Sequence, residues 1–125
     1  MVPSLCCVVE TCDDLPSVRR HLATCLRANG ASDETVESAQ LLASELVSNV
    51  LAHTDSAAEV TATTEDHVLR VAVADESDEA PTIRPVDPTR VGGNGLRIVE
   101  AFAATWGTRR RPHHGKVVWF TLALP

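Results

Sequence analysis

Three polar residues recur at equal spacing in a stretch of sequence that is otherwise mostly apolar. Glu45, Asn49 and His53 are each four residues apart, and in an α-helix this spacing places side chains on one stripe. A carboxylate and an amide oxygen on one stripe can bind Mg²⁺, a hard cation that takes oxygen ligands and keeps several waters and phosphate oxygens. A solvated helix face would have the same spacing. The three residues alone therefore leave a magnesium site and an exposed polar stripe as open interpretations.

A single acidic residue marks the end of a segment with alternating apolar positions. Asp75 stands there, at the start of a long segment without periodicity. A carboxylate held at a strand end can accept a hydrogen bond from an exocyclic amine, which is what recognition of adenine requires. Aspartate is also common as the first residue of a loop. Asp75 is thus a candidate for binding adenine or an ordinary loop residue.

A glycine-rich turn precedes the third predicted helix. It consists of Gly92, Gly93, Asn94, Gly95 and Leu96. Glycines allow the backbone to approach a ligand closely, and a helix N-terminus offers free amides and a favourable dipole. The turn is therefore a candidate phosphate site, although hinges and tight turns use the same residue types.

Apolar periodicity and turn residues predict the elements that must position these side chains. The expected order is a strand at residues 5–9, helices at 14–29 and 32–53, strands at 58–64 and 67–75, a helix at 96–104, and strands at 106–111 and 116–124. Asp14 and Ser32 are the expected N-caps of the first two helices. This order predicts an α/β (α+β) two-layer sandwich, with a mostly antiparallel mixed sheet and its helices on one face. Residues 76–94, rich in Pro and Gly, are long for a connection and are predicted to form a lid.

The order of the three features resembles the GHKL ATPases, the superfamily of gyrase, heat-shock chaperone, histidine kinase and MutL types. The segment Glu-Leu-Val-Ser-Asn at 45–49, followed by Ala52 and His53, is similar to their N-box. Asp75 stands where their first glycine box begins, and residues 93–96 are similar to their second. The closing hairpin, with Trp106-Gly107 and then Gly-Lys-Val-Val-Trp-Phe at 115–120, resembles the RsbW-like anti-sigma-factor kinases in their actinobacterial form.

This resemblance implies a Bergerat-type domain over residues 1–125, with ATP and Mg²⁺ held between the helices and the lid. It implies Asn49 as the magnesium ligand, Glu45 as the base that activates the attacking hydroxyl, and Asp75 as the adenine partner. Phosphate contacts are implied for Gly93 and Gly95, and His53, Asn94 and Leu96 belong to the same nucleotide-binding motifs. The implied acceptor is a serine or threonine of an anti-anti-sigma (STAS-type) protein. A sigma factor that the domain sequesters and a second copy in a homodimer are further implied partners.

Three positions depart from the family pattern. Ser77 and Glu79 stand where the family has glycines after Asp75, and Val117 stands where it has a threonine whose hydroxyl would help to hold the base. These departures favour an alternative function: a partner-binding module of the same fold with little or no phosphoryl transfer. The intact Glu45 favours the enzyme.

Composition and charge limit the remaining classes. A chain of 125 residues suits one domain, and the net charge of −6 would repel a polyanion, so no direct nucleic-acid partner is expected. The apolar run at 5–9 is too short for a signal peptide or a membrane span and follows no Lys or Arg. A cytoplasmic protein without a membrane partner is therefore expected.

Four cysteines lie near the N-terminus and support a further alternative. Cys6, Cys7, Cys12 and Cys25 lack the paired spacing of a zinc finger. His21 and Cys25 are four residues apart on a predicted helix, however, and could share a metal ion with Cys12. A redox or zinc switch is thus an alternative to buried, inert thiols.

Overall fold

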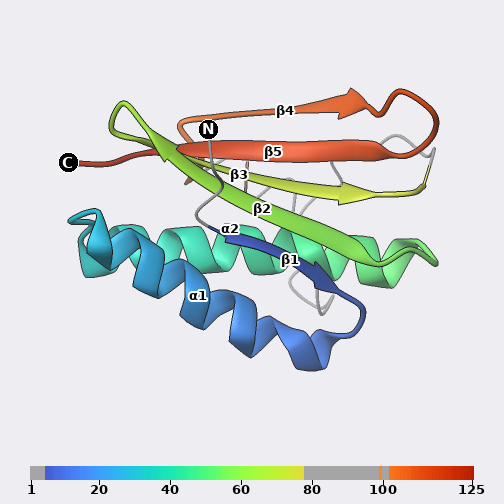
Figure 1. Cartoon of the computed structure of the whole chain (residues 1–125), viewed down its shortest axis with the longest axis horizontal. Coiled ribbons are helices and arrows are strands. Elements are labelled where there is room, and N and C mark those ends of the chain that lie inside the picture. The colour runs from blue at the N-terminus through green and yellow to red at the C-terminus, as the bar shows by residue number, and fades with distance from the viewer. Residues whose placement is uncertain (1–4, 78–98, 100–101) are drawn as a thin grey trace.

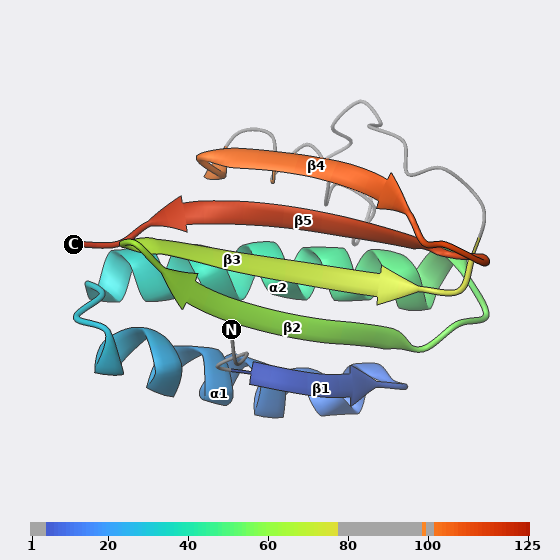
Figure 2. The ribbon, with the colours of Figure 1, turned by 45° about the horizontal axis from the view of Figure 1, so that its top comes forward.

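A five-stranded sheet carries two long helices on one face (Figure 1). The computed structural model describes residues 5–77, 99 and 102–125. The strands are β1 (Leu5–Val9), β2 (Ala58–Glu65), β3 (Val68–Asp75), β4 (Thr105–Arg110) and β5 (Lys116–Ala123). Their spatial order is β1-β2-β3-β5-β4, and every pairing among them is antiparallel. Figure 2 shows β1 at one edge of the sheet and β4 at the other. The predicted two-layer sandwich is confirmed.

The first helix, α1, spans Leu15–Ala28 and buries one apolar stripe against the sheet. Asp14 is its N-cap residue, as predicted, but the Asp14 side chain makes no capping hydrogen bond to α1. Its Oδ2 instead accepts hydrogen bonds from the backbone N–H groups of Glu10 and Thr11, 3.3 and 3.4 Å away. These bonds close a short 3-10 helix, Cys12–Asp14, which the sequence did not predict and which precedes α1.

The second helix, α2, spans Asp33–His53 and packs against one face of the sheet. The Ser32 hydroxyl caps it by accepting a hydrogen bond from the Thr35 N–H at 3.2 Å. Seven small or branched apolar side chains form its buried stripe: Val36, Ala39, Leu42, Ala43, Leu46, Val47 and Val50. No helix in the described part of the chain is long and apolar enough to cross a membrane.

The turn between β2 and β3 lies one residue later than the sequence predicts. Asp66 and His67, rather than Glu65 and Asp66, form the turn, and both have positive φ angles of 52° and 63°. Two consecutive positive φ angles match the right-handed twist of a two-residue hairpin, which explains the conformation. The shift was not predictable because neither residue is a glycine or an asparagine.

Strand β5 lies between β3 and β4 in the sheet. Its residues Val118, Phe120 and Leu122 alternate into the core. The predicted third helix, at 96–104, lies mostly outside the described residues. Val99 and Phe102 are helical, and Val99 is fully buried.

Candidate functional site

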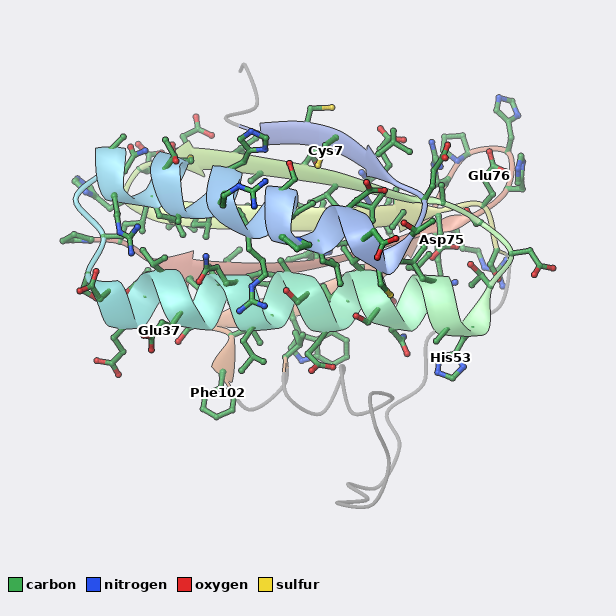
Figure 3. The ribbon with its side chains drawn as sticks, turned by 90° about the horizontal axis from the view of Figure 1, so that it is seen from below. Cys7, Glu37, His53, Asp75, Glu76 and Phe102 are labelled. Atoms are coloured by element: carbon green, nitrogen blue, oxygen red, sulfur yellow. The ribbon has the colours of Figure 1, made fainter. Side chains whose placement is uncertain are left out.

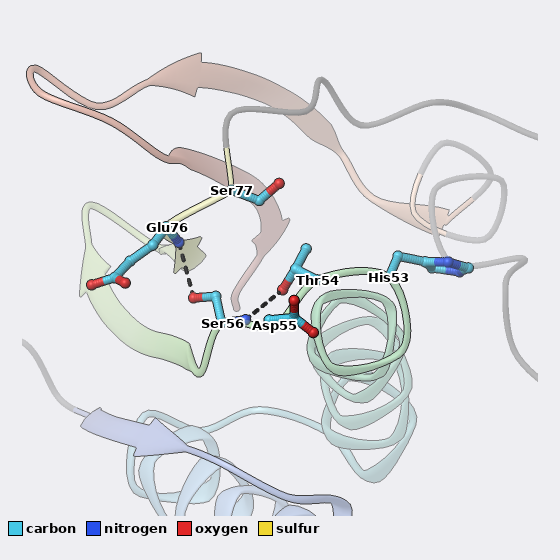
Figure 4. Close-up of a pocket in the computed structure, with 6 residues that line it drawn as sticks. All are labelled: His53, Thr54, Asp55, Ser56, Glu76 and Ser77. Atoms are coloured by element: carbon cyan, nitrogen blue, oxygen red, sulfur yellow. Dashed lines mark hydrogen bonds between the residues drawn. The ribbon is translucent and has the colours of Figure 1, made fainter.

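Helix α2 presents the polar stripe predicted from the sequence. Glu45 and Asn49 are half-buried, one turn apart, and His53 is exposed at the last residue of the helix. These three residues lie along the edge of the buried apolar stripe. One side of the helix therefore packs against the core, and the adjacent side carries the polar groups. In Figure 4, His53 points away from the loop that follows α2.

Asp75 is the buried charged residue of the described core. It is 1% exposed and continues the inward-facing series of β3, in phase with Val71 and Val73. Figure 3 shows it at the same end of the molecule as His53. The end of β3 therefore holds a carboxylate beside the C-terminal end of α2.

The two oxygens of Asp75 have different environments. Oδ1 accepts a hydrogen bond from the Ser77 N–H at 2.7 Å and is 3.1 Å from Nζ of Lys116. Oδ2 is buried and has no hydrogen-bond partner within the described part of the chain. A buried acceptor without a donor is costly, and such groups are normally satisfied by protein, water or ligand. The Asp75 carboxylate thus offers one vacant acceptor position, which fits an incoming amine.

Lys116 was not identified as a site residue from the sequence. It is the direct cross-strand partner of Asp75 in the β3–β5 ladder, and its side chain is only 12% exposed. The signal that could have found it is its phase, because Lys116 falls two residues before Val118 and four before Phe120, on the inward face of β5.

The geometry of β5 corrects the expectation about Val117. Val117 pairs with Ala74 and Arg109 and is buried outside the main core cluster. Because successive strand residues point to opposite faces, Val117 faces away from Asp75. A hydroxyl at 117 could not help to hold a base there, so this departure does not weaken the site. Lys116, on the opposite face of β5, is the residue whose side chain contacts Asp75.

A cavity of about 380 Å³ opens beside the end of α2 (Figure 4). Its described lining consists of His53, Thr54, Asp55, Ser56, Glu76 and Ser77. The Ser56 hydroxyl accepts a hydrogen bond from the Glu76 N–H at 2.9 Å, and the Thr54 hydroxyl accepts one from the Ser56 N–H at 3.1 Å. The Thr54 hydroxyl also donates to the carbonyl of Val50 at 2.8 Å. These bonds tie the end of α2 to the end of β3, which fixes the two walls of the site relative to each other.

Ser77 replaces a glycine of the family pattern without backbone strain. The described non-glycine residues with positive φ are Asp66 and His67, so Ser77 adopts a conformation open to any residue. Its N–H group supports Asp75 directly. The change from glycine is therefore not strained at Ser77, whereas Glu79 lies outside the described residues.

Gly93, Asn94, Gly95 and Leu96 all lie outside the described residues, as does most of the predicted lid at 76–94. Their predicted contacts with phosphate remain predictions.

The N-terminal cysteines do not form the alternative metal site. Among the residues that the structure describes, no three His, Cys, Asp or Glu side chains lie close enough together to hold a metal ion, so Cys12, His21 and Cys25 are not assembled. Cys7 is half-buried, and burial raises the pKa of its thiol, with smaller contributions from Cys6 and Asp14. A raised pKa lowers the thiolate fraction and makes this thiol less reactive.

The fold and the site together define a class. An antiparallel sheet covered on one face by helices, with a buried acidic acceptor at a strand end beside a polar helix stripe, is a Bergerat-type sandwich. The model of the histidine kinase-like ATPase domain matches residues 8–122. The chain therefore belongs to the histidine kinase-like ATPase family, which supports an ATP-binding, kinase-like module.

A solved structure has the same fold. The chain is similar to the crystal structure of the RsbU and RsbW domains of a protein from Mycobacterium tuberculosis, with a TM-score of 0.69 and 20% sequence identity. The similarity covers 98% of this chain and 33% of that chain. No curated protein matches the sequence significantly.

Proposed function

We propose that the chain is an ATP-dependent serine/threonine protein kinase of the RsbW-like kind. It phosphorylates an anti-anti-sigma (STAS-type) protein, sequesters a sigma factor, or does both. The observation that carries the proposal is the buried Oδ2 atom of Asp75, which lacks a donor among the described residues. The exocyclic amine of adenine supplies such a donor. A cytoplasmic location and a homodimer are further parts of this proposal.

The helix stripe supplies the groups that the terminal phosphates need. Asn49 would contribute an amide oxygen to Mg²⁺, whose remaining ligands are phosphate oxygens and waters. Gly93 and Gly95 would donate backbone N–H groups to the phosphates at a helix N-terminus. Bound Mg·ATP supplies the phosphoryl group. Asp75 would hold the base and Asn49 the metal, so both ends of the nucleotide would be fixed.

Glu45 is the proposed general base. Its carboxylate takes the proton of the attacking serine or threonine hydroxyl as the new oxygen–phosphorus bond forms. The bond between the terminal phosphorus and the bridging oxygen breaks, and ADP leaves. Such transfers depend mainly on positioning and charge stabilisation, and Glu45 stands one helical turn from Asn49.

The acidic run after Asp75 favours a second candidate. Glu76 lines the cavity and carries a negative charge, which disfavours an anionic nucleotide. Asp78 and Glu79 continue the acidic run in the sequence. A partner-binding module of the same fold, with weak or no phosphoryl transfer, would tolerate this charge. Both candidates would bind the same class of regulatory partner.

Transfer of radiolabel to a protein acceptor separates the two candidates. We expect the purified chain, with Mg²⁺ and ATP labelled at the terminal phosphate, to label a STAS-type protein from the same cell on serine or threonine. An acceptor mixture without the chain is the control. If a STAS-type candidate binds the chain but none is labelled, the binding module is correct and the kinase is excluded.

A further inference from the structure

Lys116 is a nearly buried cation that the proposed phosphoryl transfer does not use. Its side chain is 12% exposed, and the Asp75 side chain that it contacts is fully buried. The sequence contains eleven Lys and Arg residues, and Lys116 is the single lysine among them. A lysine is a compact point donor with three N–H groups, unlike the flat fork of an arginine. The single lysine of the chain thus lies beside the buried Asp75 carboxylate.

The ion pair leaves hydrogen-bonding capacity on both partners. Nζ of Lys116 lies 3.1 Å from Oδ1 of Asp75, and a lysine ammonium group has three N–H donors, more than this one contact uses. Oδ2 of the same carboxylate has no donor within the described part of the chain. The Lys116 ammonium group, a donor, therefore lies beside Oδ2 of Asp75, an acceptor without a partner among the described residues.

Adenine has the complementary pair of groups on one edge. Its exocyclic N6 amine is a donor, and the adjacent ring atom N1 is an acceptor. We propose that Lys116 is a specificity-determining residue for the base: its ammonium group donates to N1 while Oδ2 of Asp75 accepts from N6. This proposal rests on the proposed nucleotide-binding function. It predicts preference for adenine, because a purine with a carbonyl at C6 presents an acceptor where Oδ2 requires a donor.

The test compares ATP with 1-deaza-ATP, in which C–H replaces N1, by calorimetric titration of the wild-type chain with Mg²⁺. A hydrogen bond from a charged donor changes affinity by about tenfold or more, so we expect 1-deaza-ATP to bind at least about tenfold more weakly. The comparison uses the wild-type chain and does not depend on a variant that must fold. GTP should also bind more weakly than ATP.

Two variants assign the effect to Lys116. Lys116→Met should bind ATP and 1-deaza-ATP equally, because the donor to N1 is gone. Val117→Thr is the matched control, since it changes the next residue on the opposite face of β5 and should retain the full preference for ATP.

The possible results distinguish the role proposed for Lys116 from the proposed nucleotide-binding function. If the wild-type chain binds ATP and 1-deaza-ATP equally, Lys116 does not read the base, and the nucleotide-binding function stands. If it binds GTP as tightly as ATP, recognition of the base by Asp75 is overturned together with the role of Lys116. If no nucleotide binds at all, the proposed function and the role of Lys116 are both overturned.

Discussion

Replacing Glu45 by alanine is expected to lower phosphoryl transfer about a hundredfold or more while ATP affinity changes only a few fold. A positioned general base contributes on this scale, because it must be within hydrogen-bond reach of the proton that it removes. Glu45 is half-buried on α2, one turn before Asn49, so its loss removes the proposed general base and leaves the magnesium ligand Asn49 and the adenine partner Asp75 in place. The measurement is the rate of labelling of the STAS-type acceptor by each protein.

The matched control for this variant lies on the same helix. Glu37 is exposed, two turns before Glu45 (Figure 3), and Glu37→Ala should leave both labelling and ATP affinity unchanged. Equal labelling by the wild type and Glu45→Ala would remove Glu45 from the mechanism.

Replacing Gly115 by alanine is expected to destabilise the fold far more than the same change at Gly30. Both glycines have positive φ angles, 91° and 81°, so the backbone strain of about 1 to 3 kcal/mol is shared. The space around them differs. A Cβ at Gly115 would lie 2.2 Å from the backbone oxygen of Asp75, whereas at Gly30 the nearest atom is Cγ of Pro125 at 3.8 Å.

The clash at Gly115 involves backbone rather than a flexible side chain, so strand ends must separate to relieve it. We expect Gly115→Ala to lose more than about 3 kcal/mol of unfolding free energy, in the range of severe single substitutions. Gly30→Ala should lose about 1 to 2 kcal/mol. Urea unfolding of the three proteins measures both values. Equal losses would show that the close contact between Gly115 and Asp75 is not made.

Much of the fold could be predicted from the sequence because its signals are local. The strand Leu5–Val9 has its predicted bounds, and α2 begins after the predicted cap, Ser32, and ends at His53. Apolar periodicity and capping residues act within a few positions, so one sequence is enough to read them. The side chain of Asp14 was an exception, because it accepts hydrogen bonds from the backbone N–H groups of Glu10 and Thr11, which precede the 3-10 helix, and does not cap α1.

The site was only partly predictable because its central contact is not local. Asp75 and the helix stripe could be picked out by residue type and spacing, but the pairing of Asp75 with Lys116 joins residues 41 positions apart. That pairing depends on the register between β3 and β5, which no short motif specifies. The same register turns Val117 to the opposite face and explains why a motif position alone misjudged its role.

Calorimetric titration with Mg·ATP, of the wild-type chain beside Asp75→Asn, tests the central claim most directly. The wild type should bind, and Asp75→Asn should bind at least about tenfold more weakly, because an amide can present a donor where the adenine amine requires an acceptor. Asp33→Asn, an exposed change at the opposite end of α2, is the control and should bind as the wild type does. No binding by the wild type at millimolar nucleotide, or binding of ATP by Asp75→Asn as tight as that of the wild type, would contradict the proposed adenine site.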